Sequence, residues 1–410
     1  MIIRGRWRAT DYTVSLKESS LAVAIGEQPI IVCDHTGRLY SLYTDSRHHR
    51  RSLSGQVLQK WQGSAGRERQ WLDQAAADVL IDFAADQLQQ LLAALSALDW
   101  TWLTPPDQSA SLTEIVKVIE RGAQFDHVRA RSDAARFAEV YSPIGILPPD
   151  QYLALVLQAT DGCSFNTCAF CDLYHQAFRI KMPDEFRQHL KRVREYLGES
   201  ILLRQRSIFL GAANALAIPM PRLLPIFEIV AQEFPLSVRK RGKGEGQIGV
   251  YAFLDAFTGT RKSIDDYRAL AELGLKRVYI GLESGHDPLL EFVRKPGHAH
   301  DAIDTVQSIK AAGVNVGVIV MIGLGGDRFA EGHVVDTNQV LSEMQLGTGD
   351  LLYFSDLVEE PTTLYPTLAA QHSIRALNVI ERNDQRAAIR KGLRLQGVKV
   401  SNYDVREFVY

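Results

Sequence analysis

Cysteine is scarce in this chain, whose 410 residues include only four. Nothing in the sequence suggests an oxidising compartment, so a framework of disulfide bonds is a poor interpretation. The first six residues, MIIRGR, are not followed by the apolar segment of a secretory signal. No apolar run reaches the roughly 20 residues of a transmembrane helix. We therefore expect a protein of the reducing cytoplasm.

The sequence also lacks an excess of charge of one sign. Lys and Arg number 46 against 48 Asp and Glu, which gives a formal net charge of −2. A strongly basic surface is the usual electrostatic feature of proteins that bind nucleic acid or anionic membranes. The composition therefore gives no reason to expect either partner.

Two glycine-rich segments do not match the known phosphate-binding fingerprints. Residues 323–328 (GLGGDR) carry arginine where a dinucleotide-binding loop has its third glycine. Residues 241–246 (RGKGEG) precede a predicted strand instead of following one, and they lack the Gly-Lys-Ser/Thr of a phosphate loop. We interpret 241–246 as a flexible loop.

What the chain does have is a concentration of its cysteines. Cys163, Cys168 and Cys171 lie in one loop, with four residues between the first pair and two between the second. The loop follows a short apolar stretch, residues 152–157, that is typical of a buried strand. Gly162 allows the chain to leave that strand sharply. Parallel α/β barrels carry their chemistry at this end of their strands.

Three thiolates in one loop can surround one metal centre, and thiolates select iron–sulfur clusters or zinc. His175 follows Cys171 by four residues. The three cysteines and this histidine could therefore form a closed zinc site. In that alternative the chain is a zinc-stabilised protein that binds a ligand or a partner. The loop alone leaves both possibilities open.

Residues 1–145 are predicted to form a separate α/β module of unknown role. Apolar residues at 30–34 and 37–43 predict two strands joined by a short turn, and helical spacing predicts helices over about 70–98 and 111–121. Cys33 lies within the first of these strands and is expected to be a small buried hydrophobic residue. The basic residues 48–51 (HHRR) are interpreted as a solvated loop.

Beyond Pro143, Pro148 and Pro149 the pattern alternates between strands and helices, which predicts a parallel sheet with crossover helices. The predicted strands lie near 152–159, 206–211, 248–254, 277–283, 315–322 and 350–356. The predicted helices lie near 184–196, 221–233, 264–273, 299–311 and 332–344. Residues 361–410 are expected to be a helical extension, with one long helix over about 368–395.

The cysteine loop resembles that of the radical S-adenosylmethionine (radical SAM) superfamily. The commonest spacing there is Cys-x3-Cys-x2-Cys, and this chain has one residue more between the first pair, as some uncharacterised branches do. The resemblance implies a partial six-stranded (β/α)6 TIM-like barrel over 150–360, with the N-terminal module as an extension. It also implies that Cys163, Cys168 and Cys171 hold a four-iron four-sulfur cluster whose fourth iron binds S-adenosylmethionine.

The resemblance further implies which residues contact S-adenosylmethionine. Phe170 matches an aromatic position near the adenine, and Lys295 lies where related proteins have a basic residue for the methionyl carboxylate. The remaining implied contacts follow the second, fourth and fifth strands: Gly211, Ala212, Ala213 and Asn214; Glu283 and Ser284; Ile322 and Gly323.

By the same resemblance, the reduced cluster would cleave S-adenosylmethionine reductively. The resulting 5′-deoxyadenosyl radical would abstract hydrogen from a substrate, small or otherwise, that the sequence does not identify. A flavodoxin- or ferredoxin-type reductant is implied, and no side chain beyond the cluster is expected to be catalytic. No cysteine follows Cys171, which excludes the cysteine-ligated auxiliary clusters of the peptide-modifying branches.

Overall fold

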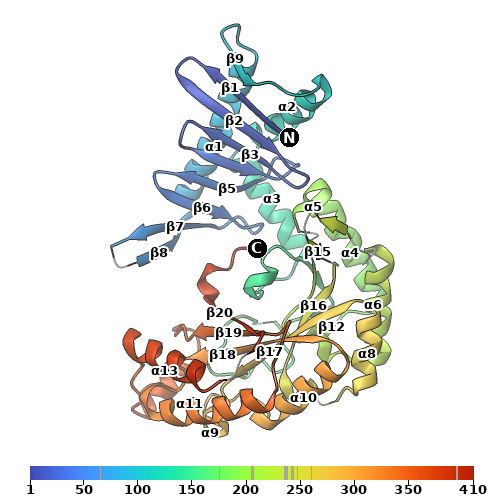
Figure 1. Ribbon diagram of the computed structural model, residues 1–410, viewed down its shortest axis with the longest axis vertical. Helices are drawn as coiled ribbons and strands as arrows, with labels where there is room; N and C mark the ends of the chain where they lie inside the picture. The colour runs from blue at the N-terminus through green and yellow to red at the C-terminus, as the bar shows by residue number, and fades with distance from the viewer. Residues whose placement is uncertain are drawn as a thin grey trace. The chain divides into compact units, whose positions relative to one another are not determined.

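The computed structural model describes residues 1–64, 66–174, 176–204, 207–234, 239–241, 244–246, 248–259, 261–393 and 396–410. His175, the possible fourth zinc ligand, and residues 242–243 of the expected loop lie outside this part. The chain divides into two compact units (Figure 1). Unit 1 comprises Met1–Ser142, Lys191–Arg206 and Val409–Tyr410; unit 2 comprises Pro143–Leu190 and Ser207–Phe408.

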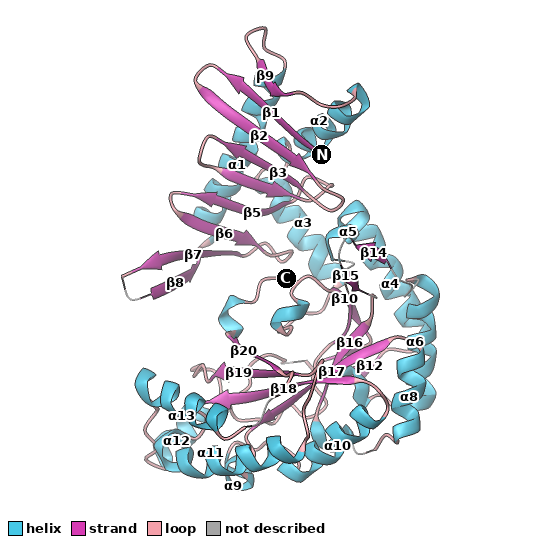
Figure 2. Cartoon of the chain, in the orientation of Figure 1, coloured by secondary structure: helices cyan, strands magenta, loops and turns pink. Residues whose placement is uncertain are grey.

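Unit 1 contains a nine-stranded antiparallel sheet in the order β8-β7-β6-β5-β4-β3-β2-β1-β9, so that successive strands form hairpins (Figure 2). Only two of these strands were predicted from the sequence. The basic residues 48–51 lie in strand β6, so their interpretation as a solvated loop was wrong. The strands are β1 (Ile2–Trp7), β2 (Thr10–Leu16), β3 (Leu21–Ile25), β4 (Ile30–Cys33), β5 (Leu39–Thr44), β6 (Arg47–Arg51), β7 (Val57–Gly63), β8 (Gly66–Trp71) and β9 (Thr101–Thr104).

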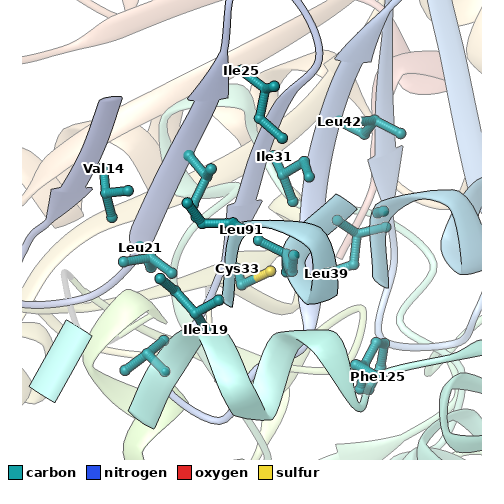
Figure 3. Packing of buried hydrophobic residues seen from close by; sticks show 14 of the residues in the cluster. Val14, Leu21, Ile25, Ile31, Cys33, Leu39, Leu42, Leu91, Ile119 and Phe125 are labelled. Carbon is teal, nitrogen blue, oxygen red and sulfur yellow. The ribbon is translucent and has the colours of Figure 1, made fainter. Parts of the chain in front are cut away.

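Helices α1 (Gln74–Leu95) and α2 (Ser109–Ala123) pack their apolar residues against one face of this sheet. Figure 3 shows Cys33 in that core together with Leu21, Leu91 and Ile119. Cys33 is 2 % exposed, and burial holds the pKa of its thiol above the usual range. The interpretation of Cys33 as a buried hydrophobic residue is therefore confirmed.

A buried cluster of charged residues joins helix α3 (His127–Val140), which was not predicted, to the sheet. Arg38 Nε donates to Asp133 Oδ1 at 2.7 Å, and Arg51 Nη2 donates to Asp133 Oδ2 at 3.2 Å. Arg38 also donates to the carbonyl of Tyr196 at 2.6 Å and to Ser200 Oγ at 3.1 Å. One carboxylate thus holds two guanidinium groups away from solvent. Unit 1 also contains η2 (Gly198–Ser200) and α5 (Ile201–Arg204).

Unit 2 contains a seven-stranded parallel sheet in chain order, β10-β13-β16-β17-β18-β19-β20, and this confirms the predicted parallel α/β architecture. Among the described strands, β10 and β20 are the edges and do not pair with each other. The strands are β10 (Leu155–Gln158), β13 (Ile208–Gly211), β16 (Val250–Leu254), β17 (Leu275–Glu283), β18 (Asn315–Ile322), β19 (Leu351–Asp356) and β20 (Lys399–Tyr403). Two short hairpins pair β11 (Thr160–Asp161) with β12 (Arg179–Ile180), and β14 (Arg239–Arg241) with β15 (Gly244–Gly246).

The helices that alternate with these strands include α4 (Pro183–Leu197), α6 (Met220–Glu233), α7 (Ala256–Gly259), α8 (Ile264–Glu272), α9 (Asp287–Phe292), α10 (Ala299–Ala311) and α11 (Gly326–Glu343). Among them, α4, α6, α8 and α10 agree with the predicted positions, α11 begins six residues earlier than predicted, and α7 and α9 were not predicted. Short 3-10 turns are η1 (Pro149–Gln151), η3 (Ala215–Ala217) and η4 (Val405–Glu407). In the described part of the chain, no helix has the length and apolar character needed to span a bilayer.

The C-terminal segment differs from the prediction in two ways. The expected long helix over 368–395 is two helices, α12 (Tyr365–Gln371) and α13 (Val379–Lys391). Asn378 begins α13 with a capping box. Its side chain accepts a hydrogen bond from the amide of Glu381, and the side chain of Glu381 accepts one from the amide of Asn378. Strand β20, which was not predicted, pairs in parallel with β19.

One end of the parallel sheet is held together by Asp150 of η1. Its carboxylate accepts hydrogen bonds from Tyr279 Oη at 2.6 Å, Tyr353 Oη at 2.8 Å and Arg277 Nη1 at 3.1 Å. Side chains alternate between the two faces along a strand, so Gly281, two residues after Tyr279, lies on the same face and nearer the carboxyl end of β17. This face therefore leads from Asp150 to the carboxyl ends of the strands.

Candidate active site at the cysteine loop

The cysteine loop begins with a sharp turn at Gly162. This residue has φ +67°, and a Cβ built on it would lie 2.3 Å from the backbone oxygen of Gln176. Only glycine fits both the left-handed conformation and that close approach. The turn carries the chain from β11 into the loop, as its place in the sequence predicted.

The far end of the loop is fixed by backbone hydrogen bonds. The amide of Ala169 donates to the carbonyl of Val293, and the amide of Tyr365 donates to the carbonyl of Ala169, both at 2.8 Å. Thr362 Oγ1 donates to Asp172 Oδ2 at 2.6 Å. The segment that carries Cys168 and Cys171 is therefore held by two regions of the chain that are far away in sequence.

All three cysteines of the loop line one cavity of about 210 Å³. Burial raises the pKa of the Cys168 thiol, and burial together with the two neighbouring thiols raises that of Cys171 to about 11. Three thiolates would repel one another here, so a cationic centre is needed to hold them deprotonated. The donor set therefore fits an iron–sulfur cluster.

In the described residues, no three His, Cys, Asp or Glu side chains are grouped closely enough to hold one metal ion. The cysteines that bind a four-iron cluster differ from such a group, because each thiolate ligates a separate iron. Convergence on one cavity, without crowding around one point, is compatible with a cluster.

Glu283 and Lys295 form an ion pair inside this cavity. Lys295 Nζ lies 3.5 Å from Glu283 Oε1, and the two side chains are 14 % and 12 % exposed. Burial alone would lower the pKa of Lys295, but Glu283, Cys168 and Asp255 raise it overall. Lys295 therefore places a buried positive charge beside the cysteines.

The backbone at Glu283 explains how its carboxylate reaches the cavity. The register of β17 against β18 shifts between Gly281 and Glu283, and Glu283 has φ +61°. A Cβ on Gly281 would lie 2.5 Å from Glu283 Oε1. The bulge and the missing side chain at Gly281 together leave room for the carboxylate. Left-handed backbone at a residue other than glycine costs energy and is concentrated at functional sites.

Asn214 connects the cysteine loop to the end of β16. Its amide nitrogen donates to Ser164 Oγ at 2.8 Å and also to Asp255 Oδ2, while Asp255 N donates to Asn214 Oδ1 at 3.1 Å. Asp255 was not predicted from the sequence, although it follows strand β16 directly. An acidic residue immediately after a predicted strand was the signal that could have identified it.

Comparison with family models finds a match for the segment that contains these residues. Residues 157–336 match the family model described as the radical SAM superfamily, and this segment contains the three cysteines, Glu283 and Lys295. The matched segment is less than half of the chain. Among curated proteins, none is significantly similar in sequence.

Solved structures of radical SAM enzymes are similar to the chain at a low level. The methyltransferase TsrM from Kitasatospora setae, solved with cobalamin and a [4Fe-4S] cluster, is 13 % identical with a TM-score of 0.40, over 53 % of this chain and 39 % of its own. Coproporphyrinogen III oxidase (HemN) from Escherichia coli is 14 % identical with a TM-score of 0.39, over 63 % and 54 %. The hydrogenase maturase HydG is 15 % identical with a TM-score of 0.38, over 77 % and 62 %. This chain thus covers less than two thirds of each of these proteins, and TM-scores below 0.5 carry no argument about activity.

The cavity at the cysteine loop is lined by most of the residues proposed from the sequence, and five lie outside it. Phe170, Ala213, Asn214, Glu283 and Lys295 line the cavity with the cysteines. Those that do not line it are Gly211, Ala212, Ser284, Ile322 and Gly323. The amide of Gly323 donates to Gln385 Oε1 at 2.8 Å, and Ile322 is fully buried.

Ser284 belongs to a buried hydrogen-bond network outside the lining of the cavity. Its hydroxyl lies 2.7 Å from His333 Nδ1 and accepts from the amide of His286 at 3.0 Å. Thr337 Oγ1 accepts from the amide of Gly285 at 2.9 Å. The network fixes the turn that follows Glu283, so the serine serves to hold that turn.

The C-terminal segment also contributes to the cavity at the cysteine loop, which the sequence did not predict. Tyr403 of β20 and Val405 line it, together with apolar residues such as Leu173, Phe253 and Ile319. Tyr403 Oη donates to the carbonyl of Leu147 at 2.8 Å, which holds the ring in place. No local sequence signal could have identified these residues, because their role depends on strand pairing.

Unit 2 is expected to lose stability in acid through His333. Burial, and to a lesser extent the neighbouring His286, lowers the pKa of this imidazole from 6.5 to about 4. Between those values the unfolded chain binds a proton at His333 that the folded chain does not. The free energy of unfolding therefore falls by about 3 kcal/mol as the pH is lowered through this range. His286 in turn lies with its Nδ1 2.6 Å from Asp336 Oδ2.

His333→Gln removes this titrating group, so the free energy of unfolding should depend less on pH in the variant than in the wild type. Urea unfolding followed by far-UV circular dichroism at pH 7 and pH 4.5 measures it, with the exposed His372→Gln as control. An equal pH dependence in the wild type and His333→Gln would show that His333 does not cause the acid sensitivity.

Proposed function

We propose that this protein is a radical SAM enzyme in which Cys163, Cys168 and Cys171 hold a four-iron four-sulfur cluster. The observation that supports this most is the convergence of three thiols on one cavity that also holds Lys295 and Glu283. When bound, the cluster and S-adenosylmethionine supply a 5′-deoxyadenosyl radical, which takes a hydrogen atom from the substrate. The substrate is unidentified.

The residues of the cavity have distinct parts in this proposal. Lys295 supplies the positive charge that a methionyl carboxylate requires, and Glu283 supplies acceptors for hydroxyl or ammonium groups. Phe170 offers an aromatic surface for adenine. Ala213 lets the backbone approach the ligand closely. The apolar walls, Tyr403 included, exclude water from a reactive intermediate.

Ser284, Gly211, Ala212, Ile322 and Gly323 support the cavity from outside its lining in this proposal. Ser284 is a positioning residue, because it acts through the turn that carries Glu283. The other four lie at or beside the carboxyl ends of β13 and β18.

The parallel sheet of unit 2 is proposed to be the wall of a partial, open TIM-like barrel. Its strands follow the order of the chain, and the cavity lies at their carboxyl ends, where parallel α/β folds carry their chemistry. Strand β20 adds a seventh strand to the six that were expected. The N-terminal module is proposed to act as a separate extension.

Cleaving S-adenosylmethionine in this way requires an external electron. We therefore include in the proposal a low-potential reductant of the flavodoxin or ferredoxin type, and an unidentified substrate that need not be large. All four cysteines are free thiols, which suits the reducing cytoplasm as the place of action.

Anaerobic reconstitution with iron and sulfide tests the proposal. The full-length protein should take up close to four irons and four sulfides, and with dithionite and S-adenosylmethionine it should form 5′-deoxyadenosine. A fully loaded protein that forms none would contradict the proposed activity. A protein that binds one zinc ion, takes up no sulfide and loses zinc in His175→Ala would support the zinc alternative, which the family match does not favour.

A further inference from the structure

Unit 1 contains a second cavity, unrelated to the cysteine loop, whose lining is strongly basic. Its volume is about 250 Å³. Four arginines line it, against a single carboxylate: Arg38, Arg121, Arg129 and Arg136, with Asp133. Such an excess is unusual for a chain with a formal net charge of −2.

The arrangement of helix α3 gives this cavity its basic wall. Arg129, Ser132, Asp133 and Arg136 are spaced three, four and seven residues after the first, so they share one face of the helix. Arg129 and Arg136 are two turns apart, about 10 Å along the axis. Ser132 lies between them, and Arg121 approaches from the end of α2.

Two of the four guanidinium groups already have carboxylate partners. Arg38 is bound to Asp133, as described above, and Arg121 Nη1 donates to Glu199 Oε2 at 2.6 Å. The Arg38 pair is buried, with both side chains under 10 % exposed. These pairs neutralise part of the positive charge in the cavity lining, although the Arg121 side chain remains one third exposed.

Arg129 and Arg136 differ from these two. In the described residues, neither has a carboxylate within ion-pair distance. Arg129 donates to the neutral amide oxygen of Gln124 at 2.9 Å, and Arg136 lies 5.7 Å from the ring centre of Tyr196. Both are exposed on the helix yet line the same cavity. Their neighbour Arg131 faces elsewhere and pairs with Asp78.

From this geometry we propose that the cavity binds the phosphate group of a small anionic ligand. Guanidinium groups reach it from two turns of α3 and from α2, with a hydroxyl between them. A tetrahedral phosphate can accept from all of these directions, whereas the two oxygens of a carboxylate lie in one plane. The site needs neither the cluster nor S-adenosylmethionine, so it stands independently of the proposed enzymatic function.

Isothermal titration of the full-length protein with orthophosphate and with pyrophosphate, at constant ionic strength set with sodium chloride, tests the proposal. We expect saturable binding in the wild type. Each lost charged hydrogen-bond partner should weaken binding by about tenfold, so that Arg129→Gln with Arg136→Gln weakens it by about a hundredfold. Pyrophosphate binding much tighter than orthophosphate would indicate a ligand whose two phosphates span the two arginines. Similar affinities would indicate a monophosphate.

Arg131→Gln is the matched control, because it removes the same charge from the same helix outside the cavity. It should change phosphate affinity by less than about twofold, since screened surface charges act weakly at this range. Arg136→Lys keeps the charge but loses the guanidinium fork, and should lie between the wild type and the glutamine variant. The proposal fails if the wild type binds neither anion. It also fails if Arg131→Gln weakens binding as much as the double variant.

Discussion

Replacing Cys163, Cys168 or Cys171 with alanine should abolish iron and sulfide binding almost completely. Each thiolate ligates a different iron of the proposed cluster, so one substitution leaves two protein ligands, too few to hold it. Iron and sulfide content after anaerobic reconstitution, together with the cluster's visible absorption, measures the effect. 5′-Deoxyadenosine formation should fall below detection in all three variants, because the proposed chemistry depends on the cluster.

Cys33→Ala is the control that the chain itself provides. Cys33 is buried in the core of unit 1, and its loss should leave a small cavity but unchanged iron content. If Cys33→Ala lost iron as completely as the loop variants, the cluster could not be assigned to Cys163, Cys168 and Cys171. Retention of a full cluster in any one loop variant would equally contradict the assignment.

Asp133→Ala should be the most destabilising single substitution considered for unit 1. It leaves Arg38 and Arg51, which are 7 % and 4 % exposed, without their shared carboxylate. Removing one partner of a buried ion pair leaves the other charge buried without a partner, which lowers the free energy of unfolding by about 3–5 kcal/mol. Asp34 accepts a weaker contact from Arg38 at 3.9 Å and should offset only part of the loss.

The measurement can be confined to unit 1, because all five tryptophans of the chain lie between Trp7 and Trp102. Urea unfolding followed by tryptophan fluorescence therefore reports on this unit. Glu139→Ala, an exposed acidic position on the same helix, should change the free energy of unfolding by less than about 0.5 kcal/mol. The double variant Asp133→Ala with Arg51→Met should lose less free energy of unfolding than the two single variants lose together. Arg51→Met removes one of the two charges that Asp133→Ala leaves without a partner. A loss in Asp133→Ala no larger than that of Glu139→Ala would show that the buried cluster does not stabilise the unit.

Most strands of unit 2 could be predicted from the sequence because most residues of β10, β13, β16, β17, β18 and β19 are buried. A continuous apolar run such as residues 315–322, with a predicted helix before and after it, predicts a buried strand of a parallel sheet. Strand β20 could not be predicted, since Tyr403 alone of its five residues is buried and, among the described strands, it pairs only with β19. The break between α12 and α13 depends on the capping box at Asn378, which lies within an otherwise helical pattern.

Most strands of the nine-stranded sheet in unit 1 could not be predicted from the sequence, for a different reason. Its hairpin strands place charged residues on the exposed face, and β6 reads as a basic cluster. The turn between β5 and β6 uses Asp45 and Ser46, with φ of +50° and +57°, in place of the Asn-Gly pair that usually marks such a turn. Helix α3 was missed although Asp126 caps it, because its apolar positions are few.

By itself, the sequence determined that three cysteines share one loop at the end of a strand in a parallel α/β unit. Spacing along the chain suffices for that, because loop and strand are local features. Only the tertiary structure decided which polar groups join those cysteines in one cavity. Glu283 reaches it through a bulge beside Gly281, Lys295 comes from a separate segment, and Tyr403 comes from an edge strand. These positions depend on strand pairing and on the close packing of distant residues, which no local pattern encodes.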